Sequence, residues 1–146
     1  MTTTDMLAKI EETLNRAKTG VLATVDRDGA PHMRWMTPAV LQGRAGCLYA
    51  ITSPAFAKII QLNANPAVEW LIQVPSLKEI ISIKGSANVI VSPALNNEIV
   101  SAIGKHLFVF WNVNPKTDVV ALETVMHSAT FFAPMSGVKE SVVFRS

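Results

Sequence analysis

The feature that most constrains the fold is a hairpin signal, an Asp-Gly pair between two segments rich in β-forming residues. Residues 20–26 read GVLATVD, residues 27–29 carry the turn, and a returning strand is predicted over 32–41. Asp-Gly is typical of the tight turns that join antiparallel strands. Pro38 lies in the returning segment, and because proline donates no backbone hydrogen bond it predicts a bulge or an edge position there.

Further strand patterns follow at short intervals along the chain. The sequence predicts strands over residues 47–52, 68–74, 79–91, 119–125, 129–132 and 141–144. Gly85 interrupts the longest of them and predicts a bulge or the bend of a closing barrel. These patterns give a mainly β protein of roughly six or seven mostly antiparallel strands with peripheral helices. A closed or partly open small barrel would leave few unpaired sheet edges.

Helix signals occupy three of the connections. An amphipathic first helix is predicted to be capped by Thr4 or Asp5 and to stop at Gly20. Serine followed by proline is a favoured helix start, and this pair occurs before both other helices. The second and third helices are accordingly predicted between Ser53-Pro54 and Asn65-Pro66, and between Ser92-Pro93 and Gly104.

Composition narrows the class of protein. With 146 residues the chain is expected to form a single domain over residues 1–146. Hydrophobic residues make up 49% and charged residues 16%, which favours apolar surface buried between identical subunits. A net charge of +2 without a run of Lys or Arg gives no reason to expect a nucleic-acid partner. No apolar run reaches membrane-spanning or signal-peptide character, so a cytoplasmic protein without a membrane partner is expected.

Familiar catalytic and metal-binding motifs are not found in the sequence. There is no glycine-rich dinucleotide motif after a strand, no phosphate-binding P-loop, and no recognisable catalytic triad. His32, His106 and His127 do not fall at the spacings of metal ligands, so no metal site is predicted. Cys47 lies in an apolar strand pattern, which favours a buried, inert thiol. No catalytic residue can be assigned.

What remains is a candidate anion site around the predicted start of the second helix. Free backbone N–H groups at such a start favour phosphate, and Thr52 and Ser53 add hydroxyl groups there. Lys58 follows about one turn later, and Arg34 stands on a neighbouring strand, where a buried guanidinium would need an acidic or anionic partner. Alternatively, Lys58 is solvated, Arg34 pairs with a carboxylate, and the Ser-Pro pair is only a helix start.

Several motifs occur in one order over roughly residues 4–92. They are the hairpin LATVDRDGAPHMRWM with its Arg34, the stretch YAIT ending at Thr52 and followed by Lys58, the helix end LNANP before Val68, and the strand motif Ile83-Lys84-Gly85. In this order and spacing the chain resembles the FMN-binding split β-barrel superfamily, typified by pyridoxamine 5′-phosphate oxidase. It is most similar to the short members that resemble general stress protein 26.

The resemblance implies an FMN site and assigns roles to residues. Arg34 and Lys58 would grip the FMN phosphate, and Thr52 and Ser53 would donate hydrogen bonds to it. The strand from Arg34 to Thr37 would run along the isoalloxazine ring, with Trp35 and Met36 alternating between core and flavin. Trp111 would lie near the flavin of the partner subunit or, equally, in the core.

Members of this family are homodimers with two FMN sites at the subunit interface, so the resemblance implies an FMN-dependent oxidoreductase of that kind. The chain departs from the oxidase at Ala57, where the family has an Arg, and at Ile80, where it has a flavin-contacting Gln. The Arg-x-His substrate signature is also not found, so oxidation of pyridoxamine 5′-phosphate itself is not expected. The substrate and the electron donor are not indicated.

Two alternatives stay open at this point. A split barrel with another cofactor would use deazaflavin F420, or haem with His32 or His127 as a proximal ligand. A protein of another class would be a flavin-binding module without turnover, acting as a sensor, store or interaction domain.

Overall fold

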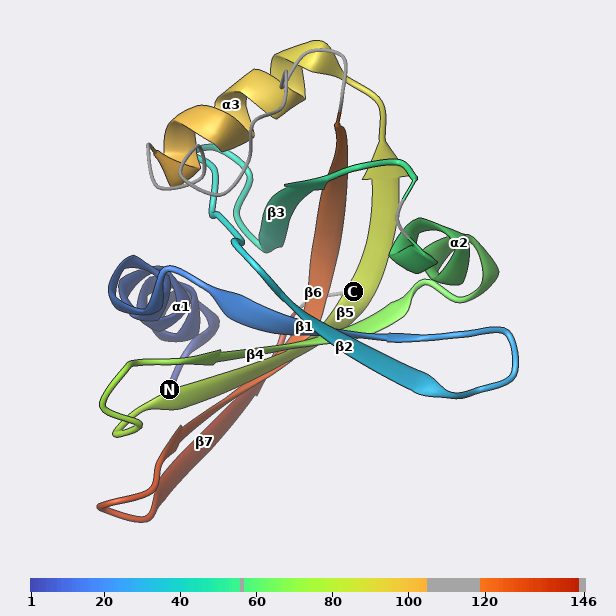
Figure 1. Ribbon diagram of the computed structural model, residues 1–146. Coiled ribbons are helices and arrows are strands. Elements are labelled where there is room, and N and C mark those ends of the chain that lie inside the picture. The colour runs from blue at the N-terminus through green and yellow to red at the C-terminus, as the bar shows by residue number, and fades with distance from the viewer. Residues whose placement is uncertain (56, 105–118, 145–146) are drawn as a thin grey trace.

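In the part of the chain that the structure describes, one antiparallel sheet has seven strands, and three helices lie around it (Figure 1). The computed structural model describes residues 1–55, 57–104 and 119–144, while the side chains at positions 57, 58 and 60 lie outside what it describes. The elements are α1 (Thr3–Ala17), β1 (Gly20–Val25), β2 (Pro31–Met36), β3 (Cys47–Thr52), α2 (Ala57–Ala64), β4 (Ala67–Gln73), β5 (Ile80–Ile90), α3 (Pro93–Ile103), β6 (Val120–Ala133) and β7 (Val138–Val143).

The strands follow the order β2-β1-β4-β5-β6-β3, and β7 pairs with the other end of β6. The mainly β architecture predicted from the sequence is confirmed. The path does not close, because β2 at one end of it and β3 at the other are not paired along their lengths. An isolated bridge joins Ala39, just after β2, to Tyr49 in β3, with backbone N–O distances of 2.7 and 2.9 Å. This open barrel is consistent with a split β-barrel.

Four of the predicted strands differ in extent, including the final one, which runs over Val138–Val143 instead of residues 141–144. The returning strand ends at Met36 rather than near Leu41, because Pro38 follows and cannot donate to a ladder. The two strands predicted over residues 119–125 and 129–132 form the single 14-residue strand β6. Its polar residues in between, such as His127, are tolerated because they point out of the sheet.

The predicted bulge at Gly85 is confirmed. The register between β5 and β6 shifts between Lys84 and Gly85. A Cβ atom on Gly85 would collide with the carbonyl oxygen of Val125 and approach Thr124 Cγ2 to 2.9 Å. Only glycine lets the two backbones come this close at the bend.

The first helix begins earlier than predicted. Thr2 is its N-cap, and Thr2 and Asp5 form a capping box in which each side chain accepts the other's backbone N–H at 3.0 Å. Lys18, with φ of 67°, ends the helix, so Gly20 starts β1 instead of stopping α1. The third helix matches its prediction, with Ser92 as N-cap and Gly104 as C-cap.

Among the described residues, the core consists of two clusters of buried apolar side chains. The larger fills the inside of the sheet, where α1 covers one side of it through Met6 and Ile10, both fully buried. The smaller lies under α3, between that helix and β3, and includes Ile99 and Tyr49. Among the described residues, no helix combines the length and apolar character needed to cross a bilayer.

Candidate functional site

Arg34 lies on the core side of β2, which is unusual for a charged residue in an apolar run. In the hairpin register it stands opposite Leu22, whose side chain is fully buried. The half-buried guanidinium donates from Nη1 to the carbonyl oxygen of Leu22 at 3.1 Å and from Nη2 to Gln61 Oε1 at 3.0 Å. Among the described residues its partners are therefore neutral oxygens, and no carboxylate pairs with it. Burial lowers the pKa of Arg34, but a guanidinium stays charged at any ordinary pH.

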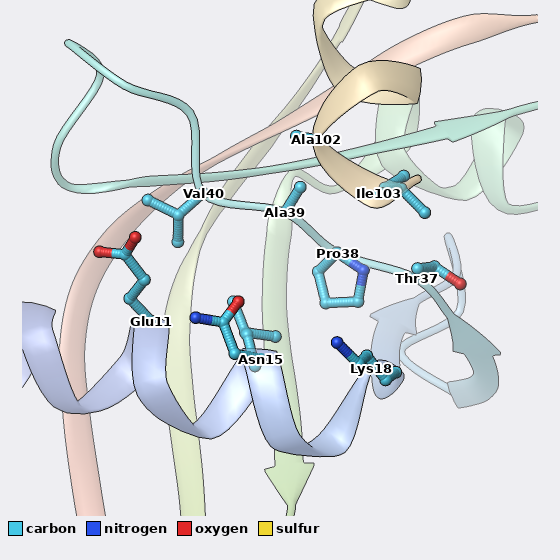
Figure 2. A pocket seen from close by; sticks show the side chains of 10 residues that line it. Glu11, Asn15, Lys18, Thr37, Pro38, Ala39, Val40, Ala102 and Ile103 are labelled. Atoms are coloured by element: carbon cyan, nitrogen blue, oxygen red, sulfur yellow. The ribbon is translucent and has the colours of Figure 1, made fainter. Parts of the chain in front are cut away.

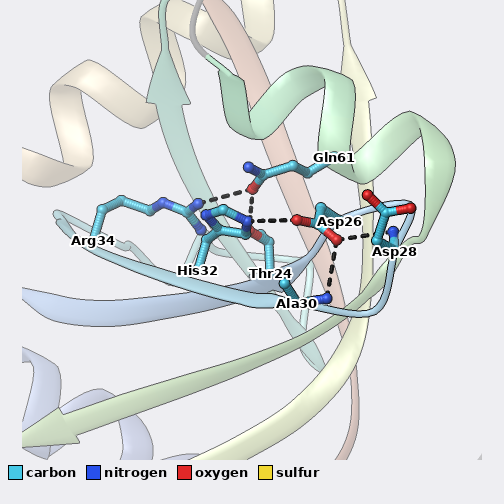
Figure 3. A network of polar contacts seen from close by, with 7 residues as sticks. All are labelled: Thr24, Asp26, Asp28, Ala30, His32, Arg34 and Gln61. Carbon is cyan, nitrogen blue, oxygen red and sulfur yellow. Dashed lines mark hydrogen bonds and ion pairs between the residues drawn. The ribbon is translucent and has the colours of Figure 1, made fainter.

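A small network holds that guanidinium in place (Figure 3). Gln61 reaches it from α2, and the same Gln61 Oε1 atom accepts a hydrogen bond of 2.6 Å from the Thr24 hydroxyl of β1. Thr24 is fully buried, since it occupies the inward position of β1 two residues after Leu22. The contacts join β1, β2 and α2, so the position of Arg34 is fixed from three elements.

Next to this network, the hairpin turn holds a second set of polar contacts. Asp26 accepts hydrogen bonds from the backbone N–H groups of Asp28 and Ala30, both at 2.9 Å, and its other oxygen lies 2.8 Å from His32 Nε2. The His32 contact is the main reason why the pKa of Asp26 is lowered, and the backbone donors add to it. His32 is thereby a surface histidine paired with a carboxylate, as part of the turn.

The last residue of β3, the strand at the other end of the path from β2, has a buried hydroxyl group without a partner in the described part of the chain. Thr52 is fully buried, and its Oγ1 has no hydrogen-bond partner among the described residues. Buried hydroxyl groups are nearly always paired, so an orphan of this kind requires an explanation. A bound polar ligand at this end of β3 would supply the missing partner.

The helix start predicted at Ser53-Pro54 was wrong. The second helix begins at Ala57, and Ser53 Oγ instead accepts from the backbone N–H of Ala55 at 3.3 Å. A serine hydroxyl bonded two residues ahead forms a local turn, which competes with the capping role. The predicted anion site thus loses its helix N-terminus directly at Ser53, while Lys58 keeps its place on α2 with its side chain outside the described part.

The register of the open sheet brings the two sides toward each other. Ala39 and Tyr49 are bridged antiparallel. Continuing that register would set Met36 opposite Thr52. The strands have separated by then, because β2 pairs only with β1 in the sheet and β3 with β6. The opening of the barrel is therefore flanked by the Arg34 side of β2 and the Thr52 end of β3.

Residues 35–37 divide between the two faces of the chain. Met36 is buried in the large core cluster, whereas Trp35 is 77% exposed on the opposite face of β2. Thr37 is half-buried and borders a small hollow of about 90 Å³ (Figure 2), which is also lined by Glu11 and Asn15 of α1 and by Lys18, the C-cap of that helix. Trp111 lies outside the described residues. The flavin contacts of these residues stay predictions.

Sequence reasoning missed Gln61 and Thr24. Their positions can be described from the sequence, since Gln61 follows Lys58 by one helical turn and Thr24 is the polar residue on the otherwise apolar inward face of β1. Neither residue type indicates a site by itself, so only the contact with Arg34 reveals them.

Comparison with known proteins shows to which family the chain belongs. A model of the pyridoxamine 5′-phosphate oxidase family matches residues 6–127, most of the chain. The chain belongs to this family. Among the curated proteins, no sequence is similar enough to count as a match.

Solved structures agree on the fold. The structure is similar to general stress protein 26 of Bacillus anthracis str. Sterne, with a TM-score of 0.74, 22% identity, and coverage of 95% of this chain and 98% of that one. It is also similar to a pyridoxamine 5′-phosphate oxidase-related, FMN-binding protein of Nostoc punctiforme PCC 73102, with a TM-score of 0.71, 17% identity, and coverage of 95% of this chain and 96% of that one. A third similar structure is an F420 reductase, with a TM-score of 0.66, 22% identity, and coverage of 82% of this chain and 94% of that one.

Proposed function

We propose that the protein binds FMN in the opening between β2 and β3 and serves as a cytoplasmic flavin-dependent oxidoreductase. The observation that carries the proposal is a charged, pre-positioned Arg34 on one side of the opening and an unpartnered, buried Thr52 hydroxyl on the other. A phosphate group has the charge for the first and the acceptor oxygens for the second. The FMN-binding relative supports a flavin as the bearer of that phosphate.

The residues fit the cofactor in a simple division of tasks. Arg34 and Lys58 would hold the phosphate, Thr52 and Ser53 would donate hydroxyl hydrogen bonds, and the backbone of residues 35–37 would support the ring. When bound, FMN supplies the hydride and electron chemistry, so the protein needs no acid or base of its own for it. Its contribution is orientation, charge and control of access.

The first test is the visible absorption spectrum of the purified protein, before and after incubation with FMN and desalting. Flavin bands that survive desalting would support the proposal. A colourless protein that retains no FMN would refute it. Addition of NADH or NADPH to the loaded protein then separates an oxidoreductase from a module without turnover, since bleaching of the flavin bands reports reduction.

The likeness to an F420 reductase makes F420 the alternative cofactor. Both ligands carry phosphate, so Arg34 and Thr52 alone do not distinguish them. Parallel titrations of the desalted protein with FMN and F420, followed by flavin fluorescence, decide between them by their relative affinity.

We also propose that the functional unit is a homodimer. The outward face of the sheet near its β2 edge carries exposed apolar side chains: Met33 at 74%, Trp35 at 77% and Leu71 at 41%. Trp35 and Leu71 both stand opposite Val21 in the register, so they form a continuous row across three strands. Light scattering after size exclusion should give twice the monomer mass, and Trp35→Lys should shift it to the monomer. A wild-type monomer would contradict this.

A further inference from the structure

We infer that Gln61 is a positioning residue for anion binding, which holds the Arg34 guanidinium in the orientation that receives the phosphate. The inference rests on the proposed FMN site and adds to it a residue without a direct part in the family resemblance. Its basis is the shared acceptor atom Gln61 Oε1, which binds Arg34 Nη2 at 3.0 Å and the Thr24 hydroxyl at 2.6 Å.

The chemistry of the partners fixes the direction of both hydrogen bonds. A guanidinium only donates, so the atom of Gln61 that faces it must be the amide oxygen and not the nitrogen. Thr24 lies against that same oxygen, and its hydroxyl must therefore be the donor. A carbonyl oxygen has two lone pairs, and in this arrangement both have a partner.

This arrangement restricts the rotation of a long side chain. Without Gln61, the one remaining contact of the guanidinium among the described residues would be with the Leu22 carbonyl oxygen at 3.1 Å, and the group could turn about it. With both contacts the plane of the group is set, and Arg offers more N–H donors than these two contacts use. The remaining donors are then available in a fixed direction, which lowers the entropy lost when a phosphate binds.

Thr24 has a supporting part in the same arrangement. It is fully buried, and among the described residues its hydroxyl meets Gln61, which anchors the far end of the glutamine side chain on β1. The order of effects should follow the order of contacts: loss of the Gln61 oxygen frees Arg34 directly, whereas loss of the Thr24 hydroxyl only loosens Gln61.

The test compares the affinities of FMN and riboflavin, which differ by the phosphate, measured by quenching of flavin fluorescence. Gln61→Met keeps the length of the side chain and removes the acceptor, so the preference for FMN over riboflavin should fall by about tenfold. Thr24→Val should lower this preference by about threefold, whereas Thr24→Ser, which retains the hydroxyl, should keep the wild-type preference. Gln42→Met, at an exposed turn, is the matched control and should change nothing.

The outcomes separate the two proposals. If the wild-type protein binds no FMN, the proposed function fails. If it binds FMN but Gln61→Met keeps the wild-type preference for FMN over riboflavin, with or without an equal weakening of both ligands, Gln61 does not position Arg34 for the phosphate and the inference is overturned. Failure of Thr24→Ser to recover what Thr24→Val loses would equally contradict the arrangement.

Discussion

Thr24 and Thr52 are both fully buried threonines near the opening of the barrel, but their hydroxyl groups have opposite fates. Thr24 donates to Gln61, which also accepts from Arg34, so the polar side chains on the β1–β2–α2 side of the opening are already held in place without a ligand. Thr52 at the end of β3 has no partner among the described residues. The contrast indicates a site that is held rigidly on the side of its charge and that, on the other side, has a buried hydroxyl group without a hydrogen-bond partner among the described residues.

The largest effect is expected from removing the charges. The double variant Arg34→Ala, Lys58→Ala should weaken FMN by about 1.5–3 kcal/mol for each lost phosphate contact, while riboflavin changes little. Isothermal titration with both flavins measures this. Equal loss of affinity for the two ligands would mean that the residues act through folding, and Arg34 and Lys58 would then not form a phosphate site.

A change far from the opening provides a stability reference. Gly85→Ala forces a Cβ into the carbonyl of Val125 at the β5 bulge, and such overpacking costs about 1–3 kcal/mol. Urea unfolding should show a lowered midpoint. The preference for FMN over riboflavin should stay at the wild-type value in protein that remains folded, which shows that reduced stability does not by itself imitate loss of the phosphate site.

The two threonines can be compared directly by the same substitution. Thr24→Val removes a hydrogen bond and leaves the Gln61 oxygen with one partner fewer, so the free energy of unfolding should fall by about 1 kcal/mol. Thr52→Val removes an unpaired buried hydroxyl, so the ligand-free protein should be unchanged or more stable by up to about 1 kcal/mol, with weaker FMN binding. Thermal unfolding with and without FMN gives both numbers. Equal destabilisation by the two variants would mean that the Thr52 hydroxyl is paired as the Thr24 hydroxyl is, which would contradict the comparison.

The smallest effect concerns the hairpin turn beside Arg34. The pKa of Asp26 is lowered mainly by His32, so the stability that its carboxylate contributes is present above the ordinary aspartate pKa and is lost as the pH falls through the lowered value. In His32→Ala the pKa should rise, but only in part, since the N–H groups of Ala30 and Asp28 remain. Carbon NMR of the Asp26 carboxyl follows this, and an unchanged pKa in the variant would exclude the contact.

Local signals predicted most elements of the fold. The Asp-Gly turn, the strand over residues 47–52, the Ser92 cap and the Gly85 bulge each depend on a few neighbouring residues, and the structure has them as predicted. The errors occurred where hydrogen-bond contacts, and not the local sequence pattern, determine the bounds of an element. The continuity of β6 comes from its strand partners, and the late start of α2 comes with the turn at Ser53.

The same distinction applies to the candidate site. Arg34, Thr52 and Lys58 could be named because the residue types and their spacing suggest phosphate, and a family resemblance assigned their roles. Gln61 and Thr24 could not, because their significance is a contact between residues distant in sequence, through one oxygen atom that no local pattern encodes.

The pairing of β3 has a consequence for how the chain reaches this structure. In the sheet β3 pairs with β6, from Cys47 with Val125 to Thr52 with Val120, so a strand from the first half of the chain waits for one near its end. During synthesis the apolar stretch CLYAIT must remain without its ladder until the C-terminal strands emerge. Pairings between distant segments form slowly and leave strand edges available to other chains. The Thr52 side of the site should therefore be among the last parts to form, and newly made protein is most prone to aggregate before it does.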